Sequence, residues 1–250
     1  MKAMLCEKFG PPEDLVLKEV ADLIPLAGQV RIATEACGVN FPDTLIIENK
    51  YQFKPDLPFA PGGEVTGIVD AVGDGVSQDL LGQPVMCMTL SGGFAEQTLC
   101  KAEDLIARPS FMPSTVAAGF TMTYGTSMHA LKQRAQLQAG ETLLVLGAGG
   151  GVGLAAVEIG KQMNATVIAA ASSAEKLNAA EDAGADHLID YSQQDLRSAL
   201  KDIVGIKGVD VVYDPVGGDM FEAALRSTAW GGRVLVVGFA SGNIPKVPIN

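Results

Sequence analysis

The chain has 250 residues, 48% of them hydrophobic, which is enough for one large or two ordinary domains with buried cores. Its formal net charge of -11 argues against a nucleic-acid partner and against an anionic membrane surface. No apolar run reaches the length of a transmembrane helix, and the first eight residues lack the apolar core of a signal peptide. We therefore expect a soluble, cytoplasmic protein.

The cysteines lie far apart in the sequence, at Cys6, Cys37, Cys87 and Cys100. None belongs to a CxxC pair, which argues against a disulfide framework and against a four-cysteine zinc site. Cys37 and Cys87 lie in apolar stretches of strand-like sequence. We expect both to be buried, unreactive thiols.

The first part of the chain, residues 1–113, is interrupted at short intervals by proline and glycine. Short apolar or alternating runs lie between these interruptions, at residues 29–33, 67–72 and 83–88. This pattern predicts a β-rich, barrel-like unit. Residues 51–61 hold too many prolines for a helix or strand and predict an ordered surface loop.

The second part, residues 114–250, begins with a helical segment. Ser114 is expected to cap a helix that breaks near Gly119 or Gly125 and resumes at residues 127–131. Strands and helices then alternate, which predicts a doubly wound parallel sheet. The predicted strands are 142–146, 165–170, 186–189, 209–213 and 232–237, and the predicted helices are 152–163, 174–183, 194–204 and 218–228. Because a dinucleotide-binding sheet has six strands, we expect this domain to be incomplete at its C-terminal end.

A glycine-rich turn follows the first of these strands. Its spacing, Ala148-x-Gly150-x-x-Gly153, fits the dinucleotide-binding fingerprint with alanine at the first small position. Backbone N–H groups at the start of the next helix suit a pyrophosphate. We therefore expect cofactor contacts from Ala148, Gly149, Gly150, Gly151, Val152 and Gly153.

The residues after the second predicted strand indicate which dinucleotide binds. An NAD site usually places an acidic residue there, but this chain has Ser172, Ser173 and Lys176. Two hydroxyls and a lysine suit an adenosine 2′-phosphate, so NADP(H) is favoured over NAD. The alternative is that one serine caps the following helix and that Lys176 is simply solvated.

Several motifs in chain order carry a family resemblance: Asn40-Phe41-Pro42-Asp43, Pro61-Gly62-Gly63-Glu64, Gly92-Gly93-Phe94-Ala95-Glu96, residues 126–131, 184–191 and 214–218, and the glycine turn. Along its whole length the chain resembles the zinc-independent, NADPH-dependent quinone oxidoreductases, zeta-crystallin-like members of the medium-chain dehydrogenase/reductase superfamily. The resemblance implies an α/β protein with a GroES-like domain at 1–113 and a Rossmann domain at 114–250. It also implies an active site in the cleft between them and a homodimer in the full-length form.

Two positions depart from the zinc-dependent alcohol dehydrogenases of the same superfamily. Those enzymes have a metal-binding cysteine at the position of Asn40 and a metal-binding histidine at the position of Gly63. An amide and a glycine do not replace a thiolate and an imidazole, so no metal is expected. The remaining chemistry is hydride transfer to an electron-poor carbon, in an apolar quinone or an enone.

The resemblance assigns catalytic positions to Asn40, Tyr51 and Asp43. The Asn40 amide is expected to donate a hydrogen bond to the substrate carbonyl oxygen, or else to be only a turn residue. Tyr51 would donate a proton or hydrogen bond, or else pack its ring against the proline-rich loop. Asp43 is expected to support the pocket through backbone bonds rather than to act as a base.

Further cofactor contacts are implied by the resemblance. Thr126 would lie near the nicotinamide carboxamide, with a helix N-cap as its alternative role. Lys176 and Tyr191 would line the 2′-phosphate and adenine pocket, although Tyr191 could also be a surface ring. Gly238, Phe239 and Ser241 would pass close to the nicotinamide. His129 and His187 are expected to be structural.

The predicted activity is NADPH-dependent, zinc-free reduction of quinones or related α,β-unsaturated carbonyls. One alternative is an enoyl-thioester or acrylyl-type reductase. An alternative of another class is an NADPH-binding structural or regulatory protein with little turnover. We further expect a protein of this length to be either a fragment or weakly active.

Overall fold

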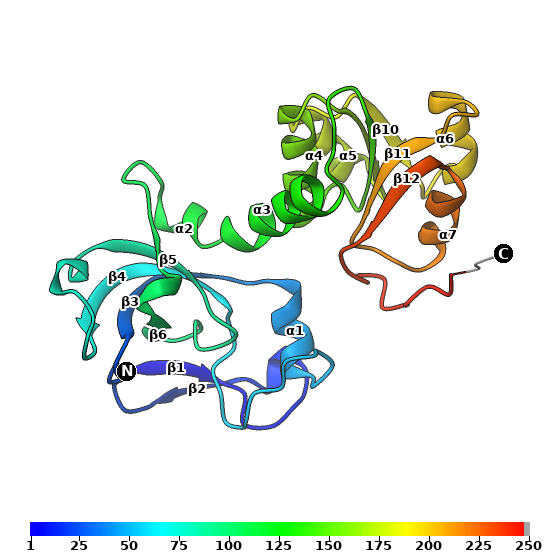
Figure 1. Cartoon of the computed structure of the whole chain (residues 1–250). Coiled ribbons are helices and arrows are strands. Elements are labelled where there is room, and N and C mark those ends of the chain that lie inside the picture. Colours follow the sequence, from blue (N-terminus) through cyan, green and yellow to red (C-terminus); the bar gives the residue numbers. More distant parts are fainter. Residues whose placement is uncertain (248–250) are drawn as a thin grey trace. The chain divides into compact units, whose positions relative to one another are not determined.

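The computed structural model describes residues 1–247 and divides into two compact units, the first at residues 1–122 and the second from residue 123 onward (Figure 1). The predicted domain boundary after residue 113 falls just before helix α2 (Ser114–Ala117), which contacts strand β3 in the first unit. The last three residues of the predicted second domain lie outside the described residues.

The first unit is a β-structure with two short α-helices, one of which is α2. Strands β1 (Lys2–Leu5) and β2 (Val16–Glu19) form an antiparallel pair. A five-stranded antiparallel sheet has the order β6-β3-β4-β5-β7. Its strands are β3 (Gln29–Gly38), β4 (Glu64–Val72), β5 (Pro84–Met88), β6 (Gln97–Lys101) and β7 (Ile106–Ala107), and helix α1 (Phe41–Ile47) follows β3. The β-rich unit predicted for this part of the chain is therefore present.

The core of this unit is built from side chains that alternate between buried and more exposed positions along β3 and β4. Val30 and Ile32 on β3, and Val65 and Val69 on β4, are at most 1% exposed and belong to one cluster. Successive side chains of a strand point to opposite faces, so every second residue reaches the interior. The β3–β4 pairing shifts register twice, between Arg31/Ile32 and Thr34/Ala36. Such irregularities bend a strand and add curvature to the sheet.

One disulfide crosses the interior of this sheet. Cys87 on β5 is bonded to Cys100 on β6, although two strands separate β5 and β6 in the hydrogen-bonded order. The expectation that Cys87 is a buried free thiol is therefore wrong: the residue is buried, but it is bonded. Cys37 is a free thiol that is only half-buried, so the expected full burial is wrong; its partial burial still raises its pKa to about 12, which agrees with an unreactive cysteine.

The proline-rich segment takes no helix or strand, as predicted. Residues 51–61 carry one isolated backbone bridge, from Phe59 to Cys6, and the Phe59 ring is buried. The helical segment that follows the first sheet differs from the prediction at its start. Ser114 is the first residue of α2, Pro113 holds the N-cap position, and no side-chain bond caps the helix. The predicted break near Gly119 is confirmed, since α3 (Thr121–Met128) begins after it and includes Gly125.

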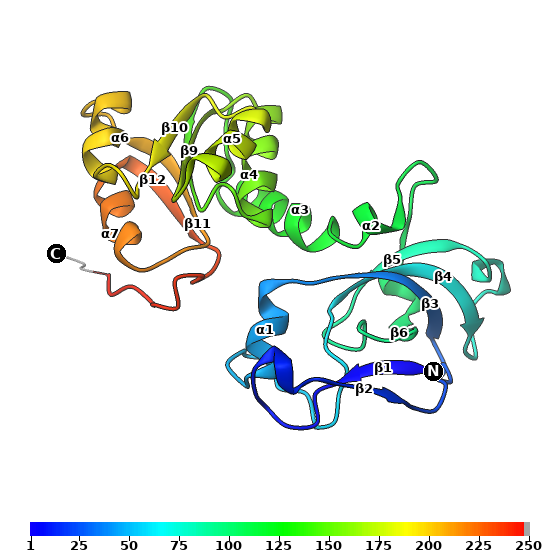
Figure 2. The same cartoon turned by 180° about the vertical axis from the view of Figure 1, so that it is seen from behind.

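The second unit is a parallel sheet covered by helices on both faces (Figure 2). The sheet order is β10-β9-β8-β11-β12 and every pairing is parallel. A π-helix at His129–Arg134 continues α3. The strands are β8 (Thr142–Leu146), β9 (Thr166–Ala171), β10 (His187–Asp190), β11 (Val209–Asp214) and β12 (Thr228–Val236). The helices are α4 (Gly151–Gln162), α5 (Ala174–Asp182), α6 (Leu196–Val204) and α7 (Asp219–Arg226).

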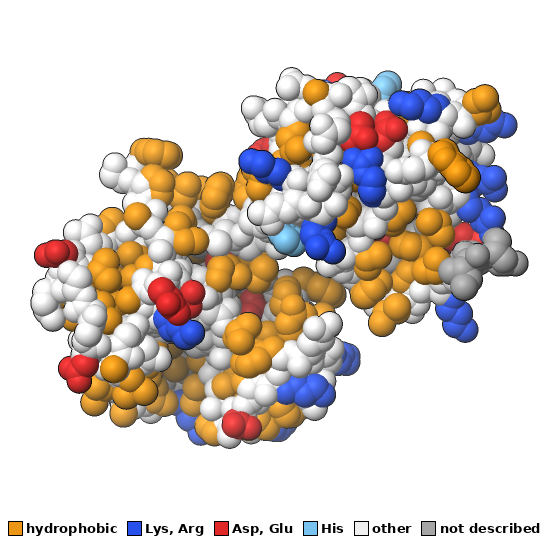
Figure 3. Space-filling model, in the orientation of Figure 1, with side chains coloured by type: hydrophobic (Ala, Val, Ile, Leu, Met, Phe, Trp, Pro, Cys, Tyr) orange, Lys and Arg blue, Asp and Glu red, His pale blue; other side chains and the backbone are white. Residues whose placement is uncertain are grey.

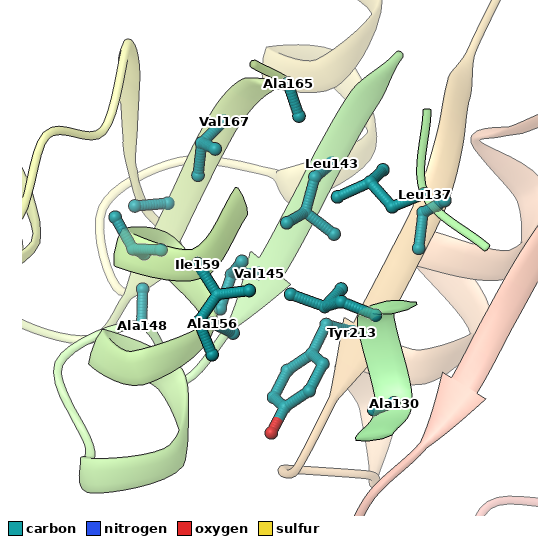
Figure 4. Packing of buried hydrophobic residues seen from close by; sticks show 14 of the residues in the cluster. Ala130, Leu137, Leu143, Val145, Ala148, Ala156, Ile159, Ala165, Val167 and Tyr213 are labelled. Carbon is teal, nitrogen blue, oxygen red and sulfur yellow. The ribbon is translucent and has the colours of Figure 1, made fainter. Parts of the chain in front are cut away.

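The central strand β8 supplies both cores of this unit. Leu143 and Val145 belong to one apolar cluster, together with residues of α4 and the buried ring of Tyr213 (Figure 4). Leu144 and Leu146 belong to the other cluster, together with residues of α6 and α7. A strand buried on both faces needs a continuous apolar run, which is why this segment could be predicted from the sequence.

Charged and apolar side chains are mixed on the surface. In Figure 3 the Lys and Arg side chains are scattered over this face of each unit, and apolar side chains cover broad areas between them. Within residues 1–247, no helix combines the length and the apolar composition needed to cross a bilayer.

Candidate functional site

The glycine turn between β8 and α4 has a shape that only small residues allow. Gly147 has φ of 59°, in the left-handed region, and Gly150 is the N-cap of α4. A Cβ on Gly153 would lie 2.3 Å from the Gly147 carbonyl oxygen. Leu154 N–H donates to the Gly150 carbonyl at 2.8 Å, so the N–H groups of residues 151–153 have no acceptor within the helix. These N–H groups lie at the positive end of the helix dipole, a geometry that suits an anion.

The turn lies where the strand order reverses direction. β8 is followed on one side by β9 and β10 and on the other by β11 and β12. In doubly wound sheets the ligand crevice opens at the carboxyl ends of the strands at this point. The loop after β11 reaches the turn, since a Cβ on Gly147 would lie 2.8 Å from Val216 Cγ2.

The predicted residues after β12 meet the same loop. Ala240 N–H donates to the Pro215 carbonyl at 3.0 Å, and Ser241 N–H donates to the Val216 carbonyl at 3.0 Å. A Cβ on Gly217 would lie 2.9 Å from the Phe239 ring. The structure therefore brings Gly238, Phe239 and Ser241 to the carboxyl edge of the sheet, beside the β11 loop.

Asp214, at the end of β11, organises that loop; the sequence placed it in a family motif but gave it no role of its own. Its Oδ1 accepts from the N–H groups of Val216 at 2.7 Å and Gly217 at 2.9 Å. The residue is 1% exposed, and its Oδ2 has no hydrogen-bond partner among the described residues. Burial raises the pKa of this carboxyl, against the opposing effect of the two N–H donors. The signals in the sequence were the family motif at residues 214–218 and an acidic residue at the end of an apolar strand.

The polar residues predicted for a 2′-phosphate gather after β9. Lys176 Nζ donates to Ser172 Oγ at 3.3 Å, and Ser173 Oγ accepts from Lys176 N–H as the N-cap of α5. A Cβ on Gly149 would lie 2.4 Å from the Cβ of Lys176, so this cluster touches the glycine turn. The capping alternative for one serine is thus correct for Ser173, and Ser172 and Lys176 remain exposed at the turn.

Tyr191 and Thr126 also take defined places in this unit. Tyr191 follows β10, and its N–H donates to the Ala171 carbonyl at 3.1 Å at the carboxyl end of β9. Its side chain is partly buried against the α6 cluster. Thr126 lies inside α3, so its alternative role as an N-cap is wrong.

Thr126 lines a cavity of about 670 Å³ beside the edge strand of the sheet. The other lining residues are Gly125, His129, Ala130, Arg134 and residues 234–237. His129 Nδ1 pairs with Gln133 Oε1 at 2.5 Å, one helical turn away. The structural role expected for this histidine stays a prediction.

In the first unit, two predicted catalytic residues meet at the start of α1. Asn40 is the N-cap, and Asp43 Oδ2 accepts from the Asn40 N–H at 2.8 Å. Asp43 is 5% exposed. Burial raises the pKa of its carboxyl, while the N–H groups of Asn40, Gly62 and Gly63 that donate to it oppose that rise. The backbone bonds expected of Asp43 are present.

Glu64 is a buried polar partner of Asn40 that the sequence reasoning did not assign. It is the first residue of β4 and is 1% exposed. Its Oε2 accepts from Asn40 Nδ2 at 2.8 Å. The signal in the sequence was a carboxylate directly before the run that starts at Val65, but its partner lies 24 residues away.

Two further positions of this unit named from the sequence are Tyr51 and Gly63, and both lie in closely packed surroundings. The Tyr51 ring packs against the buried cluster of Cys6, Ile46, Ile47 and Phe59, as its structural alternative described. A Cβ on Gly63 would lie 2.9 Å from the Thr89 carbonyl oxygen. Within residues 1–247, no three His, Cys, Asp or Glu side chains are grouped so that they could hold a metal ion.

Both units match known domain families. Residues 26–111 match the alcohol dehydrogenase GroES-like domain, and residues 151–250 match the domain described as zinc-binding dehydrogenase. A GroES-like unit followed by a doubly wound sheet is the architecture of the medium-chain dehydrogenases and reductases.

Comparison with similar proteins identifies the family within this superfamily. The chain is 41% identical over 250 residues to quinone oxidoreductase-like protein 2 of Rattus norvegicus, covering all of this chain and 71% of that relative. It superposes on the Escherichia coli quinone oxidoreductase complexed with NADPH with a TM-score of 0.94 at 31% identity, covering 100% of this chain and 76% of that one. A 2-haloacrylate reductase gives a TM-score of 0.85 at 32% identity, with coverages of 100% and 76%. The chain belongs to the zinc-independent quinone oxidoreductase family.

Proposed function

We propose that this protein reduces quinones or related α,β-unsaturated carbonyls by hydride transfer from NADPH, without zinc. The observation that carries the proposal is the close packing of Lys176 against Gly149 in the glycine turn, since a basic residue beside a helix start suits an anionic cofactor. The Escherichia coli relative of the same architecture is described as an NADPH complex, which supports the choice of cofactor.

The residues of the second unit would hold the dinucleotide. The N–H groups of residues 151–153 would bind the pyrophosphate, and Ser172 with Lys176 would bind the 2′-phosphate. Tyr191 would border the adenine, and Thr126 with residues 238–241 would border the nicotinamide. The bound nicotinamide would supply the hydride, and the protein would hold it in place.

The residues of the first unit would act on the substrate. The Asn40 amide would donate a hydrogen bond to the carbonyl oxygen on which negative charge develops. Asp43 would hold the loop of Asn40 through its backbone bonds, and Tyr51 would donate to the reduced product. The side chains flanking Asn40, Val39 and Phe41, are apolar and 77% and 50% exposed. An apolar acceptor agrees with that surface.

The test is NADPH consumption by the purified chain with 1,4-naphthoquinone as acceptor. We expect turnover in wild type and a fall of about a hundredfold in kcat in Asn40→Ala, the size of effect seen when one such donor is removed. Glu103→Gln, an exposed change elsewhere in the first unit, is the matched control. Absence of NADPH oxidation with every quinone and enone offered, despite tight NADPH binding, would support a binding protein with little turnover instead.

A second candidate is the reduction of an activated alkene attached to a carboxylate or thioester. The similarity to a 2-haloacrylate reductase favours it. Comparing kcat/KM for naphthoquinone, 2-chloroacrylate and an enoyl thioester separates the two candidates. A homodimer of the full-length form stays a prediction, to be checked by light scattering.

A further inference from the structure

We infer that Glu64 is a positioning residue that fixes which way the Asn40 side-chain amide faces. The inference rests on the proposed function only for what Asn40 then does to a substrate. The orientation itself follows from hydrogen bonds in the first unit.

Each carboxylate oxygen of Glu64 accepts a hydrogen bond. Oε2 accepts from Asn40 Nδ2 at 2.8 Å, and Oε1 accepts from the backbone N–H of Met122 at 2.8 Å. The side chain is 1% exposed, so replacing either partner with water would require opening the unit. A buried polar group that loses its partner costs more than the bond itself contributes, and both contacts are therefore strongly favoured.

These two hydrogen bonds decide which end of the Asn40 amide, Oδ1 or Nδ2, faces Glu64. The O and N ends of an asparagine have nearly the same shape, so only hydrogen bonding decides between the two flips. Both Glu64 oxygens accept, so the atom of Asn40 facing Glu64 must be the donor Nδ2. The carbonyl Oδ1 then faces away, and the second N–H of Nδ2 stays available for a substrate oxygen.

Met122 holds the other carboxylate oxygen of Glu64. It is the second residue of α3, so its N–H belongs to the helix turn that lacks internal acceptors. A carboxylate at this end of a helix is also favoured by the helix dipole. The same side chain thus satisfies the start of α3 and orients Asn40.

Gly38 supplies the space for this arrangement. A Cβ there would lie 2.8 Å from Glu64 Oε2, 3.2 Å from Asn40 Nδ2 and 2.2 Å from the Ala118 carbonyl oxygen. Any side chain at position 38 would push into the bond between Glu64 and Asn40. Glycine is needed at the end of β3 first because of the Ala118 carbonyl oxygen, and the pair of Glu64 and Asn40 fills the space beside it.

The isosteric variant Glu64→Gln tests the inference, because glutamine has one acceptor and one donor end. Met122 N–H takes the acceptor, so the glutamine NH2 faces position 40 and forces the amide to flip. We expect the Asn40 Nδ2 signals in a 1H–15N spectrum to shift strongly, with assignment from their loss in Asn40→Asp. Unchanged Asn40 signals in Glu64→Gln would overturn the inference, and Glu103→Gln should leave them in place.

A stability measurement covers the case in which Glu64→Gln is poorly folded. Asn40→Asp sets a second carboxylate against Glu64, and this acceptor–acceptor clash should lower the free energy of unfolding. Adding Glu64→Gln restores a donor opposite the new carboxylate, so the double variant should be more stable than Asn40→Asp alone. If Glu64→Gln adds no stability to Asn40→Asp, the two side chains are not paired and the inference fails.

Kinetics separate this inference from the proposed function. In Glu64→Gln we expect kcat to fall by about tenfold or more while the Kd for NADPH stays unchanged, because only the first-unit donor is displaced. A shift of the Asn40 signals without any loss of kcat would leave the positioning role intact and refute the catalytic role of Asn40. A wild-type chain without NADPH turnover would refute the proposed function and leave the spectroscopic test valid.

Discussion

The side-chain hydroxyls of Ser127 and Tyr213 lie 2.8 Å apart, and both residues are fully buried in the second unit. Ser127 Oγ also donates to the Val152 carbonyl, at 2.9 Å, in the first turn of α4. A serine hydroxyl has one hydrogen, and Ser127 donates it to the Val152 carbonyl. The Tyr213 hydroxyl must therefore be the donor to Ser127 Oγ. This chain of bonds joins α3 and β11 to the helix that begins at the glycine turn.

Removing either hydroxyl alone should lower the free energy of unfolding, but by different amounts. Tyr213→Phe deletes only the terminal donor and should cost about 1 kcal/mol of unfolding free energy. Ser127→Ala leaves the Tyr213 hydroxyl without its acceptor in the core and should cost about 1 to 3 kcal/mol. Urea unfolding of both single variants and the double variant measures the coupling. Additive effects would mean that the two hydroxyls do not interact.

Lys176→Glu should change the preference between the two nicotinamide dinucleotides. Placing a carboxylate beside the glycine turn should weaken NADPH binding by about tenfold or more, through the loss of a charge-assisted bond. NADH has no 2′-phosphate, and its affinity should change much less. Titration of both nucleotides measures this, with Lys201→Glu as the charge-matched control on α6. Equal affinities in wild type, unmoved by the substitution, would contradict the 2′-phosphate assignment.

Two glycine-to-alanine changes should affect the free energy of unfolding differently. Gly153→Ala places a methyl 2.3 Å from the Gly147 carbonyl oxygen and should destabilise the unit by about 1 to 3 kcal/mol. Nucleotide binding should weaken as well, because the turn must move. Gly125→Ala lies within α3 with nothing inside 4 Å and should be neutral or stabilise by up to about 1 kcal/mol. Thermal unfolding with and without NADPH measures both.

The ion pair of Glu141 and Arg233 should make stability fall in acid. Both Arg233 terminal nitrogens lie 2.7 Å from Glu141 oxygens, and this pairing lowers the pKa of Glu141. A carboxyl whose folded pKa is lowered contributes stability above its unfolded pKa, about 4.3, and loses it as the pH falls through the folded value. Glu141→Gln should therefore cost about 1 kcal/mol at pH 7 and nothing in strong acid. Glu181→Gln, an exposed change on α5, should show no such pH dependence.

Asp214→Asn should show the reverse pH dependence. Burial raises the pKa of Asp214, so its contribution to stability is complete below the unfolded pKa, about 3.9, and is lost as the pH rises through the folded value. The amide keeps an acceptor for Val216 and Gly217 but carries no charge. The stability of Asp214→Asn relative to wild type should therefore increase as the pH rises from about 4. A constant difference across pH would show that Asp214 does not titrate differently in the folded state, and Asp202→Asn on α6 is the control.

The second unit was the more predictable from sequence, for a physical reason. Strand β8 was predicted at residues 142–146 and lies there, because burial on both faces leaves a continuous apolar run. Strand β12 begins at Thr228 instead of residue 232, because Gly231 and Gly232 interrupt its pattern while the backbone already pairs with Val209.

The disulfide and the buried hydrogen bonds of the first unit could not be predicted, because the residues that they join are distant in sequence. Cys87 and Cys100 lie on strands that do not neighbour each other in the sheet, so their spacing carried no signal. Glu64 bonds residues 40 and 122, which no local pattern connects. The capping role expected of Ser114 failed because Pro113 already occupies the N-cap position.

The close approach of the Thr89 carbonyl to Gly63 has a consequence for redesign. A histidine introduced at position 63 would bring its Cβ to 2.9 Å from that oxygen, before the imidazole is placed at all. Thr89 follows β5 and is held there, since its N–H donates to the Gly63 carbonyl at 2.8 Å. Converting this reductase into a zinc enzyme therefore takes more than grafting two ligands onto positions 40 and 63. The end of β5 has to be rebuilt first.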